Sequence, residues 1–238
     1  MHPLCAGGAV VRLGLFALIL GGPAVGPAAA SCMDSPTAGL AACLAADGWE
    51  QVQDEDGIRV YTRDHPRSNI REVMARTLIR SDPQALFRLL TDVDRYTEFM
   101  PSTLERCELL AEHDGSYFVF QQLDLPFVDD RYYTIRLSPG TDAGGEALRL
   151  SWELAKDSRY AVEGRGSRVR VNRGFWSLRP TGRPGETEAI YFVHTDPGKI
   201  WSFVANMANR VSVPDVLRSV RERAEGRPPD GAATGRQP

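Results

Sequence analysis

The segment YFVHTDPGKIWSFVANMANRVSVPDVLRSVRERA, residues 191–224, decides the fold because it begins like a strand and becomes a long helix. Asp196 is expected to cap that helix, with Pro197 at its first position. An apolar stripe follows at helical spacing, formed by Ile200, Phe203, Val204, Met207 and Val211. Such a stripe usually packs on a core. Pro214 inside the helix predicts a kink, and a bent helix can leave a gap beneath it.

The rest of the chain predicts an α+β domain built on one sheet. Ser35 starts a helix that stops near Gly48, and Asp82 starts a second helix before a short third one. Strands are expected at 49–53, 58–63, 70–80, 104–110, 117–123, 131–137, 147–154, 169–178 and 189–195. Because successive strands have short connections, the sheet is expected to be antiparallel. The order of elements predicts a large curved sheet with the last helix on its concave face.

The N-terminal segment has the pattern of a secretory signal peptide. An arginine precedes the short apolar run LGLFALIL, and the segment ends on three alanines, so residues 1–30 are expected to be removed. An uncleaved membrane anchor is the alternative, but the apolar run is short for a span. The mature domain is then 31–223, followed by a Pro/Gly-rich tail at 224–238 that is expected to be disordered. We therefore expect an exported, periplasmic protein.

The cysteines depend on that export. An oxidising compartment would allow Cys32 and Cys43 to pair. A rival interpretation makes Cys32 a lipidated residue, which would anchor the mature protein to a membrane as a lipoprotein. Cys107 lies in a strand-like run and is expected to be a buried small hydrophobic residue.

Composition and motifs argue against several classes of function. The formal net charge of -3 gives no reason to expect a nucleic-acid partner. No phosphate-binding loop or nucleophile elbow is present, so no cofactor and no catalytic residue are predicted. No metal site is predicted either, because no metal-ligand spacing relates the four histidines His2, His65, His113 and His194. His194 lies near the last helix, as a structural residue or as an acid or base inside the fold.

One strand combines a charge with an apolar face. Alternation along 131–137 places four residues on the same side, namely Arg131, Tyr133, Ile135 and Leu137. Because this set is mostly apolar, it is the expected inner face, and Arg131 must then find a partner. That partner is either a carboxylate such as Asp129 or Asp130, or an oxygen of a bound ligand.

Aromatic residues occur on several other strands. Trp152 and Trp176 are candidates for the wall of a cavity, although most strand aromatics simply pack in the core. Phe127 lies in the apolar loop 125–128, where it could touch a membrane at the mouth of a cavity or pack as part of a turn.

Three segments, taken together, resemble a known family. TDPGKIWSFVANMANRVSVPDVLRSVR (195–221) resembles the C-terminal signature of StAR-related lipid-transfer (START) domains, in which a DPGG-like turn precedes a helix with an Asn and a later Val-Pro. DLPFVDDRYYTIRL (124–137) resembles the family's P-x-x-x-R-D segment. GWEQVQDEDGIRVYTR (48–63) resembles its opening Trp and D-G-I-x-V-Y-T-R strand. The resemblance spans nearly the whole mature chain.

The sequence departs from the START pattern at two places, and one segment is more similar to another branch of the superfamily. Arg131-Tyr132 stands where the family has Arg-Asp, and Gly198-Lys199 where it has Gly-Gly. The segment LFRLLTDVDRYTEFMPSTLERCELL (86–110) is similar to the polyketide-cyclase and coenzyme Q-binding branch of the same helix-grip superfamily. Both branches imply a helix-grip fold, a curved antiparallel sheet wrapped around a long C-terminal helix that encloses an apolar tunnel.

The resemblance implies a lipid-binding protein. It predicts a monomer that binds a lipid or other hydrophobic small molecule, transfers it between membranes and contacts them transiently. The alternatives are a cyclase or aromatase-type enzyme, a quinone-binding chaperone, and a structural domain whose cavity is filled by side chains. The residues expected to bind the ligand are Arg131, Tyr133, Ile135, Trp152, Trp176, Ile200, Phe203, Val204, Met207 and Val211.

Overall fold

The computed structural model describes residues 44–125, 128–198 and 202–226. The helices and strands in these residues include β1 (Glu50–Glu55), β2 (Ile58–His65), β3 (Ser68–Ile79), α3 (Pro83–Thr91), the 3-10 turn η1 (Val93–Arg95), α4 (Tyr96–Phe99), β4 (Leu104–His113), β5 (Ser116–Leu123), β6 (Arg131–Thr141), β7 (Leu148–Leu154), the 3-10 turn η2 (Ser158–Tyr160), β8 (Ser167–Arg168), β9 (Val171–Pro180), β10 (Thr187–Asp196) and α5 (Ser202–Ala224).

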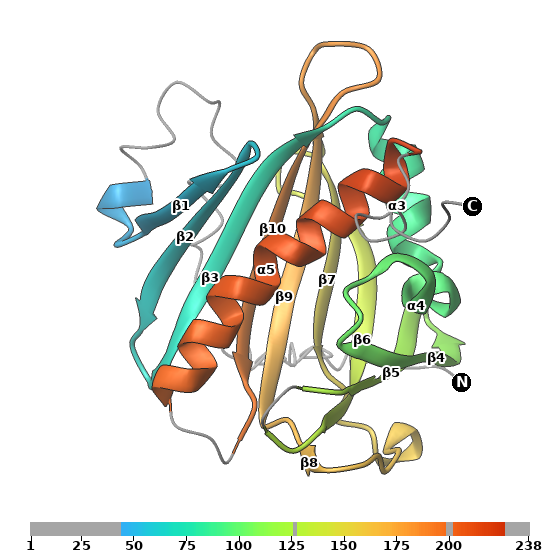
Figure 1. Cartoon of the computed structure of the whole chain (residues 1–238). Helices are drawn as coiled ribbons and strands as arrows, with labels where there is room; N and C mark the ends of the chain where they lie inside the picture. Colours follow the sequence, from blue (N-terminus) through green and yellow to red (C-terminus); the bar gives the residue numbers. More distant parts are fainter. Residues whose placement is uncertain (1–43, 126–127, 199–201, 227–238) are drawn as a thin grey trace, which may run out of the picture.

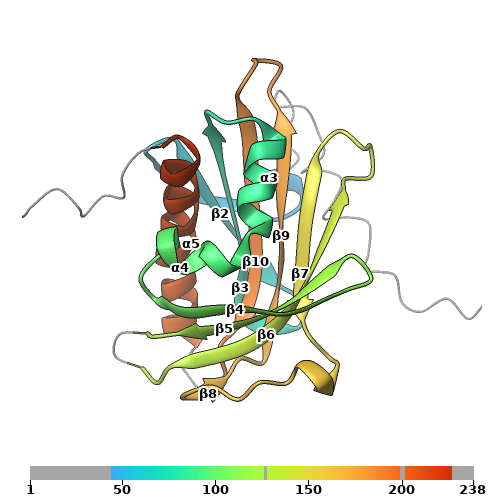
Figure 2. The same cartoon turned by 90° about the vertical axis from the view of Figure 1, so that its right-hand side faces the viewer.

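One curved sheet of ten strands organises the described residues, with the long helix α5 lying diagonally across one face (Figures 1 and 2). The strand order is β1-β2-β3-β10-β9-β7-β6-β5-β4, and these neighbours are antiparallel. The two-residue strand β8 lies off this path and pairs with β6 in parallel. Helix α5 packs on β2, β3 and β10, and α3 and α4 contact it as well. The predicted helix-grip fold is confirmed.

Local sequence signals set several boundaries as expected. Gly48 ends the first helix in a left-handed conformation (φ +79°), which glycine adopts without a steric penalty. Its N–H donates to the Ala45 carbonyl, and the Trp49 N–H donates to the Leu44 carbonyl, the paired bonds of a Schellman cap. At α3, the side chain of Asp82 accepts a hydrogen bond from the Gln84 N–H at 2.9 Å.

The start of the last helix differs from the expectation. Asp196 belongs to strand β10, where it pairs with Val171, and Gly198 has a non-helical φ of +94°. The Asp196 carboxylate accepts a hydrogen bond from the Gly198 N–H, so it closes a turn instead of capping a helix. The predictions of Asp196 as N-cap and Pro197 at the first helical position are wrong, because pairing with β9 keeps the chain extended through Asp196.

Asn206 ties α5 to the sheet. Its side-chain oxygen accepts a hydrogen bond from the Arg71 N–H at 2.8 Å, and its amide N–H donates to the Asn69 carbonyl at 3.2 Å. These two bonds satisfy backbone groups at the start of β3 and fix the position of the helix along the strand.

The sheet has a buried cluster on each of its two faces. Ala189 and Val193 of β10 belong to the core between the sheet and the helices. Ile190 and Phe192, which alternate with them and so point to the other face, belong to a second cluster. That cluster consists of Leu44, Trp49, Tyr61, Met74, Phe175, Ile190 and Phe192. A second buried layer was not predicted from the sequence.

Some of the sequence predictions lie outside the described residues. These are the signal peptide at 1–30, the pairing or lipidation of Cys32 and Cys43, and the tail beyond residue 226. Within the described part of the chain, no helix has both the length and the apolar character needed to cross a bilayer. Cys107 is buried as expected, with 8% of its surface exposed, and burial raises the pKa of its thiol to about 12.

Candidate ligand-binding cavity

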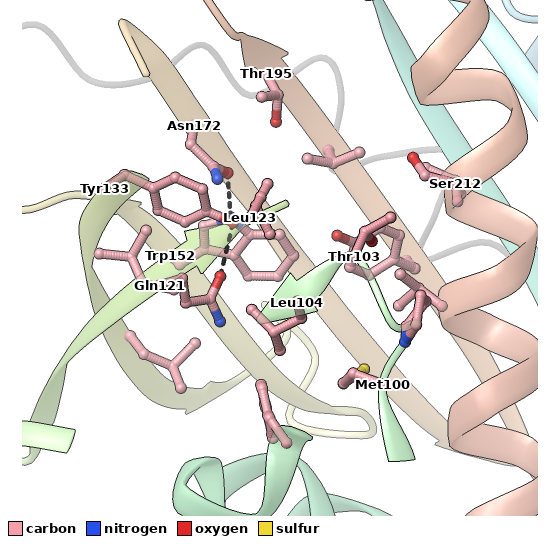
Figure 3. Close-up of a pocket in the computed structure, with 18 of the residues that line it drawn as sticks. Met100, Thr103, Leu104, Gln121, Leu123, Tyr133, Trp152, Asn172, Thr195 and Ser212 are labelled. Atoms are coloured by element: carbon pink, nitrogen blue, oxygen red, sulfur yellow. Dashed lines mark hydrogen bonds between the residues drawn. The ribbon is translucent and has the colours of Figure 1, made fainter. Parts of the chain in front are cut away.

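A cavity of about 210 Å³ lies between the inner face of the sheet and α5 (Figure 3). Strands β4, β5, β6, β7, β9 and β10 supply most of its wall, α5 supplies one side, and the segment around α4 contributes the rest. The described lining residues are Tyr96, Met100, Pro101, Thr103, Leu104, Gln121, Leu123, Tyr133, Ile135, Leu137, Trp152, Asn172, Trp176, Tyr191, Val193, Thr195, Ser212, Val213 and Val216.

Aromatic rings form one wall of the cavity. Trp152 stacks on Tyr191 with ring centroids 5.4 Å apart, and Trp176 meets the same tyrosine at 4.7 Å. Burial raises the pKa of Tyr191 and, as the main cause, that of Tyr133. Both phenols therefore stay protonated at neutral pH, and this wall is uncharged.

Two hydrogen bonds cross the polar part of the cavity. The Tyr133 hydroxyl donates to Gln121 Oε1 at 2.7 Å, and Trp152 Nε1 donates to Asn172 Oδ1 at 2.8 Å (Figure 3). Each pair links neighbouring strands, because β5 pairs with β6 and β7 pairs with β9. The wall thus combines apolar surface with a few fixed polar groups, which is the usual composition of a small-molecule site.

Gly174 makes room for the indole of Trp152. The two residues are directly opposite in the β7–β9 pair. A Cβ at position 174 would lie well inside van der Waals contact with the Trp152 ring and with the backbone carbonyl of Phe192. Only a residue without a side chain lets the ring lie across β9 at this point.

Four of the predicted ligand-binding residues are brought together in the cavity wall: Tyr133, Ile135, Trp152 and Trp176. Leu137 joins them, as alternation along β6 predicts. These four residues line the cavity, but that they contact a ligand is still a prediction. Gln121 and Asn172 were missed, although period-2 alternation back from Trp176 reaches Asn172 on the same face.

Arg131 lies elsewhere, and its partners are unexpected. Its side chain is 2% exposed and is not among the described residues that line the cavity. The guanidinium donates to three backbone carbonyls, those of Pro197 at 2.9 Å, Asp130 at 3.0 Å and Asp129. We considered the carboxylates of Asp129 and Asp130 as possible ion-pair partners of Arg131. In the structure the backbone oxygens of these two residues, and not their carboxylates, accept hydrogen bonds from the guanidinium. A contact between Arg131 and a ligand stays a prediction.

The α5 residues in the wall differ from the predicted stripe. Val211 is 63% exposed, so the expectation that it faces the cavity is wrong. Val213 and Val216 line the cavity instead, with Ser212 beside them. Val211 lies two residues before Val213, about 200° around the helix and so on the opposite side. Ile200 and the side chains of Phe203, Val204 and Met207 lie outside the described residues, as does Phe127.

His194 faces away from the cavity. Its neighbours Val193 and Thr195 line the cavity, and alternation turns His194 to the other face of the sheet. There its ring stacks on that of His65, with centroids 4.3 Å apart and planes 11° apart. Neither ring nitrogen of His194 makes a hydrogen bond of normal geometry within the described residues. The hypothesis of an acid or base inside the tunnel is therefore wrong for this residue.

The surroundings of the histidine pair keep it uncharged. Burial is the main cause that lowers the pKa of both rings. Arg173 on β9 lowers both further, and His65 lowers the pKa of His194, whereas Glu72 on β3 raises both. The other groups that act on one ring are Arg63 and Arg67, which lower the pKa of His65, and the Ile70 backbone, which raises that of His194.

We expect the protein to lose stability in mild acid through this pair. A lowered folded-state pKa means that the unfolded chain binds more protons below about pH 6.5. The free energy of unfolding should then fall as pH drops from 7 to 5. Changing His194→Phe keeps a ring against His65 and removes the titration, so it should reduce that fall by up to about 1 kcal/mol. Urea unfolding at several pH values measures this. His113→Phe, at an exposed position on β4, is the control, and an unchanged pH slope in His194→Phe would contradict the assignment.

Comparison with known proteins now supplies the family. Residues 79–221, more than half of the chain, match the family model described as polyketide cyclase / dehydrase and lipid transport. The chain belongs to this family. An uncharacterized Pseudomonas aeruginosa protein is 30% identical over 193 residues, which cover 79% of this chain and 93% of the relative.

Solved structures of similar shape agree with that family and with the START resemblance. A STAR-related lipid transfer protein from Xanthomonas axonopodis is 24% identical, covers 75% of this chain and 99% of its own, and has a TM-score of 0.67. The human StAR-related lipid transfer protein 5 is 12% identical, covers 84% and 97% of the two chains, and has a TM-score of 0.65. At these identities the likeness shows the fold.

The departure from the family's Arg-Asp pair has a structural counterpart. Tyr132, which stands where START domains have the Asp, donates a hydrogen bond from its hydroxyl to the Glu163 carboxylate. Tyr132 alternates with the cavity-lining Tyr133, so it points to the other face of β6, toward the segment before β8. In this member of the family the position after Arg131 therefore holds that segment against the sheet.

Proposed function

We propose that the protein binds a lipid or other hydrophobic small molecule in the cavity under α5 and carries it between membranes as a monomer. The observation that carries the proposal is the cavity itself, a space between sheet and helix lined mainly by apolar and aromatic side chains. The family's lipid-transport members and the lipid-transfer names of the similar structures support it.

The mechanism is physical. Each CH₂ group moved from water into such a cavity gains about 0.8 kcal/mol, so the wall replaces the bilayer around the tail of a ligand. The cavity of about 210 Å³ is smaller than the roughly 300–1,000 Å³ of most ligand sites, so a full-sized lipid needs the cavity to widen. Movement of α5 and the loops beside it would open the site for exchange during transient membrane contact.

We also propose that the protein is exported to the periplasm after loss of the signal peptide at 1–30. Anchoring through a lipidated Cys32 is the alternative. Either location would place the protein next to the membranes that supply and receive the ligand.

A binding role fits the wall better than a cyclase or aromatase activity does. The titratable groups identified in the wall are tyrosines, Tyr96, Tyr133 and Tyr191, and burial raises the pKa of all three. Groups of this kind stay protonated near neutral pH, whereas efficient acid–base catalysis uses a group with a pKa near the working pH. A quinone carrier would be one form of the proposed binding function.

A filled cavity tests the proposal. Val216→Trp places a large ring in the cavity wall, whereas Val211→Trp makes the same change at a position on α5 that is 63% exposed. We expect the natural chain and Val211→Trp to speed the movement of a fluorescent lipid from donor to acceptor vesicles. Val216→Trp should lose most of this activity, at least tenfold. Equal transfer by the two variants would show that the lipid does not travel in this cavity.

A further inference from the structure

The two amide side chains of the cavity, Asn172 and Gln121, have more hydrogen-bond donors than their protein partners use. An indole N–H can only donate, so the oxygen of the Asn172 amide must face Trp152 Nε1, as the 2.8 Å bond shows. That bond uses the acceptor of Asn172 and leaves its NH₂ group. One of its two N–H groups lies within hydrogen-bonding reach of the Tyr133 hydroxyl, a contact that acts to lower the pKa of that phenol. The other N–H group makes no hydrogen bond to the described residues.

Gln121 repeats the pattern on β5. Its oxygen accepts from the Tyr133 hydroxyl at 2.7 Å. One of its two N–H groups reaches Cys107 Sγ at 3.7 Å, a weak acceptor. Figure 3 shows both amides in the same part of the cavity, beside Tyr133 and Trp152. The oxygens of both amides accept hydrogen bonds from within the protein, and each amide keeps an N–H group that can donate to a ligand.

The same wall offers little to a charged group. All nineteen described lining residues have uncharged side chains. Arg131, at the start of β6, is held by three backbone carbonyls and is not among the described residues that line the cavity. A carboxylate or phosphate placed beside the two amides would gain hydrogen bonds but would lose its hydration without a counter-charge from these residues.

We propose that the cavity selects an uncharged hydrophobic molecule with a carbonyl-type acceptor oxygen, a ketone, quinone or ester, held by the amide N–H groups of Asn172 and Gln121. The proposal rests on the function proposed above and names the chemical class of its ligand. An acceptor oxygen between the two amides gives a partner to the N–H group that each amide has left, and it brings no charge with it.

The test compares two probes of equal chain length, decan-2-one and decanoate, by calorimetric titration of the full mature chain at pH 8. The ketone should bind at least about tenfold more tightly than the carboxylate.

Asn172→Leu and Gln121→Leu should each weaken ketone binding by roughly fivefold, the value of one neutral hydrogen bond. Asn172→Asp removes the NH₂ group but keeps an oxygen that accepts from Trp152 Nε1. It therefore tests the amide donor while the bond to Trp152 is retained. Gln51→Leu makes the same change as Gln121→Leu at an exposed position on β1 and should alter neither affinity.

The possible outcomes distinguish the proposed ligand class from the proposed binding function. If decanoate binds as tightly as the ketone, or if neither Asn172 variant weakens ketone binding, the ligand class proposed here is wrong while a binding cavity stands. If the natural chain binds neither probe, the proposed function itself is overturned, and the ligand class with it.

Discussion

Replacing Gly174→Ala should lower the free energy of unfolding by about 3 kcal/mol, the upper range for forcing extra volume into a packed site. The added Cβ would collide with the Trp152 ring and with the Phe192 carbonyl. The carbonyl belongs to the backbone of β10 and cannot swing aside, so strand β9 or the indole must move. A moved indole would also give up its bond to Asn172, so ligand binding should weaken in the same variant.

Gly140→Ala is the matched control. Gly140 also lies in a strand, β6, but a Cβ there meets nothing within 4 Å and the residue does not need a left-handed backbone. Its stability should stay within about 0.5 kcal/mol of the natural chain. Urea unfolding of the three proteins decides the matter. Similar stability in all three would mean that the close approach of Trp152 to β9 does not exist in solution.

Arg131→Leu should be similarly costly, by about 3 kcal/mol, because it leaves up to three carbonyl groups without their charged donor. Those carbonyls belong to Asp129, Asp130 and Pro197, so the guanidinium joins the start of β6 to the turn that leads into α5. Loss of the side chain should loosen that turn as well as lower the unfolding free energy. Urea unfolding and hydrogen exchange of the backbone near Gly198 measure the two effects.

Arg136→Leu provides the comparison on the same strand. Arg136 is exposed and its Nε donates to the Ser116 hydroxyl at 3.3 Å, so its loss should cost less than about 1 kcal/mol. Equal effects of the two changes would contradict the structural role of Arg131. If Arg131→Leu instead kept the unfolding free energy of the natural chain and lost only ligand binding, a direct contact between Arg131 and a ligand would be favoured.

Local patterns predicted the parts of the fold that depend on neighbours in sequence. Gly48 and Asp82 end and begin helices through bonds within a few residues, and both predictions hold. Alternation placed Tyr133 and Ile135 on the inner face because the pleat of a strand fixes which side each residue takes. The START resemblance added the arrangement of the strands around the last helix, which periodicity alone does not give.

The failures come from contacts between distant segments. Asp196 looks like a helix cap, but pairing with Val171 keeps it in a strand. Strand β8 has two residues and exists only through its pairing with β6, so no local pattern marks it. The partners of Arg131 are backbone oxygens, which no side-chain pattern encodes. Val211 was assigned by extending one stripe along α5, although the residues that face the sheet lie on another side of the helix.

The amides of Gln121 and Asn172 show the same limit at the candidate site. A polar residue in a strand is ordinarily expected to face water, so neither was chosen from the sequence. The structure turns both inward because Tyr133 and Trp152 from adjacent strands satisfy their oxygens. Only the register of β5 with β6 and of β7 with β9 brings these pairs together.

Native mass spectrometry of the mature protein purified from its natural host tests the central claim most directly, followed by organic extraction of the same sample. We expect one equivalent of a hydrophobic molecule on the chain, released by solvent, uncharged and carrying a carbonyl-type oxygen. The bare mass of the chain, together with no uptake of any component when a membrane lipid extract from that host is added, would contradict it.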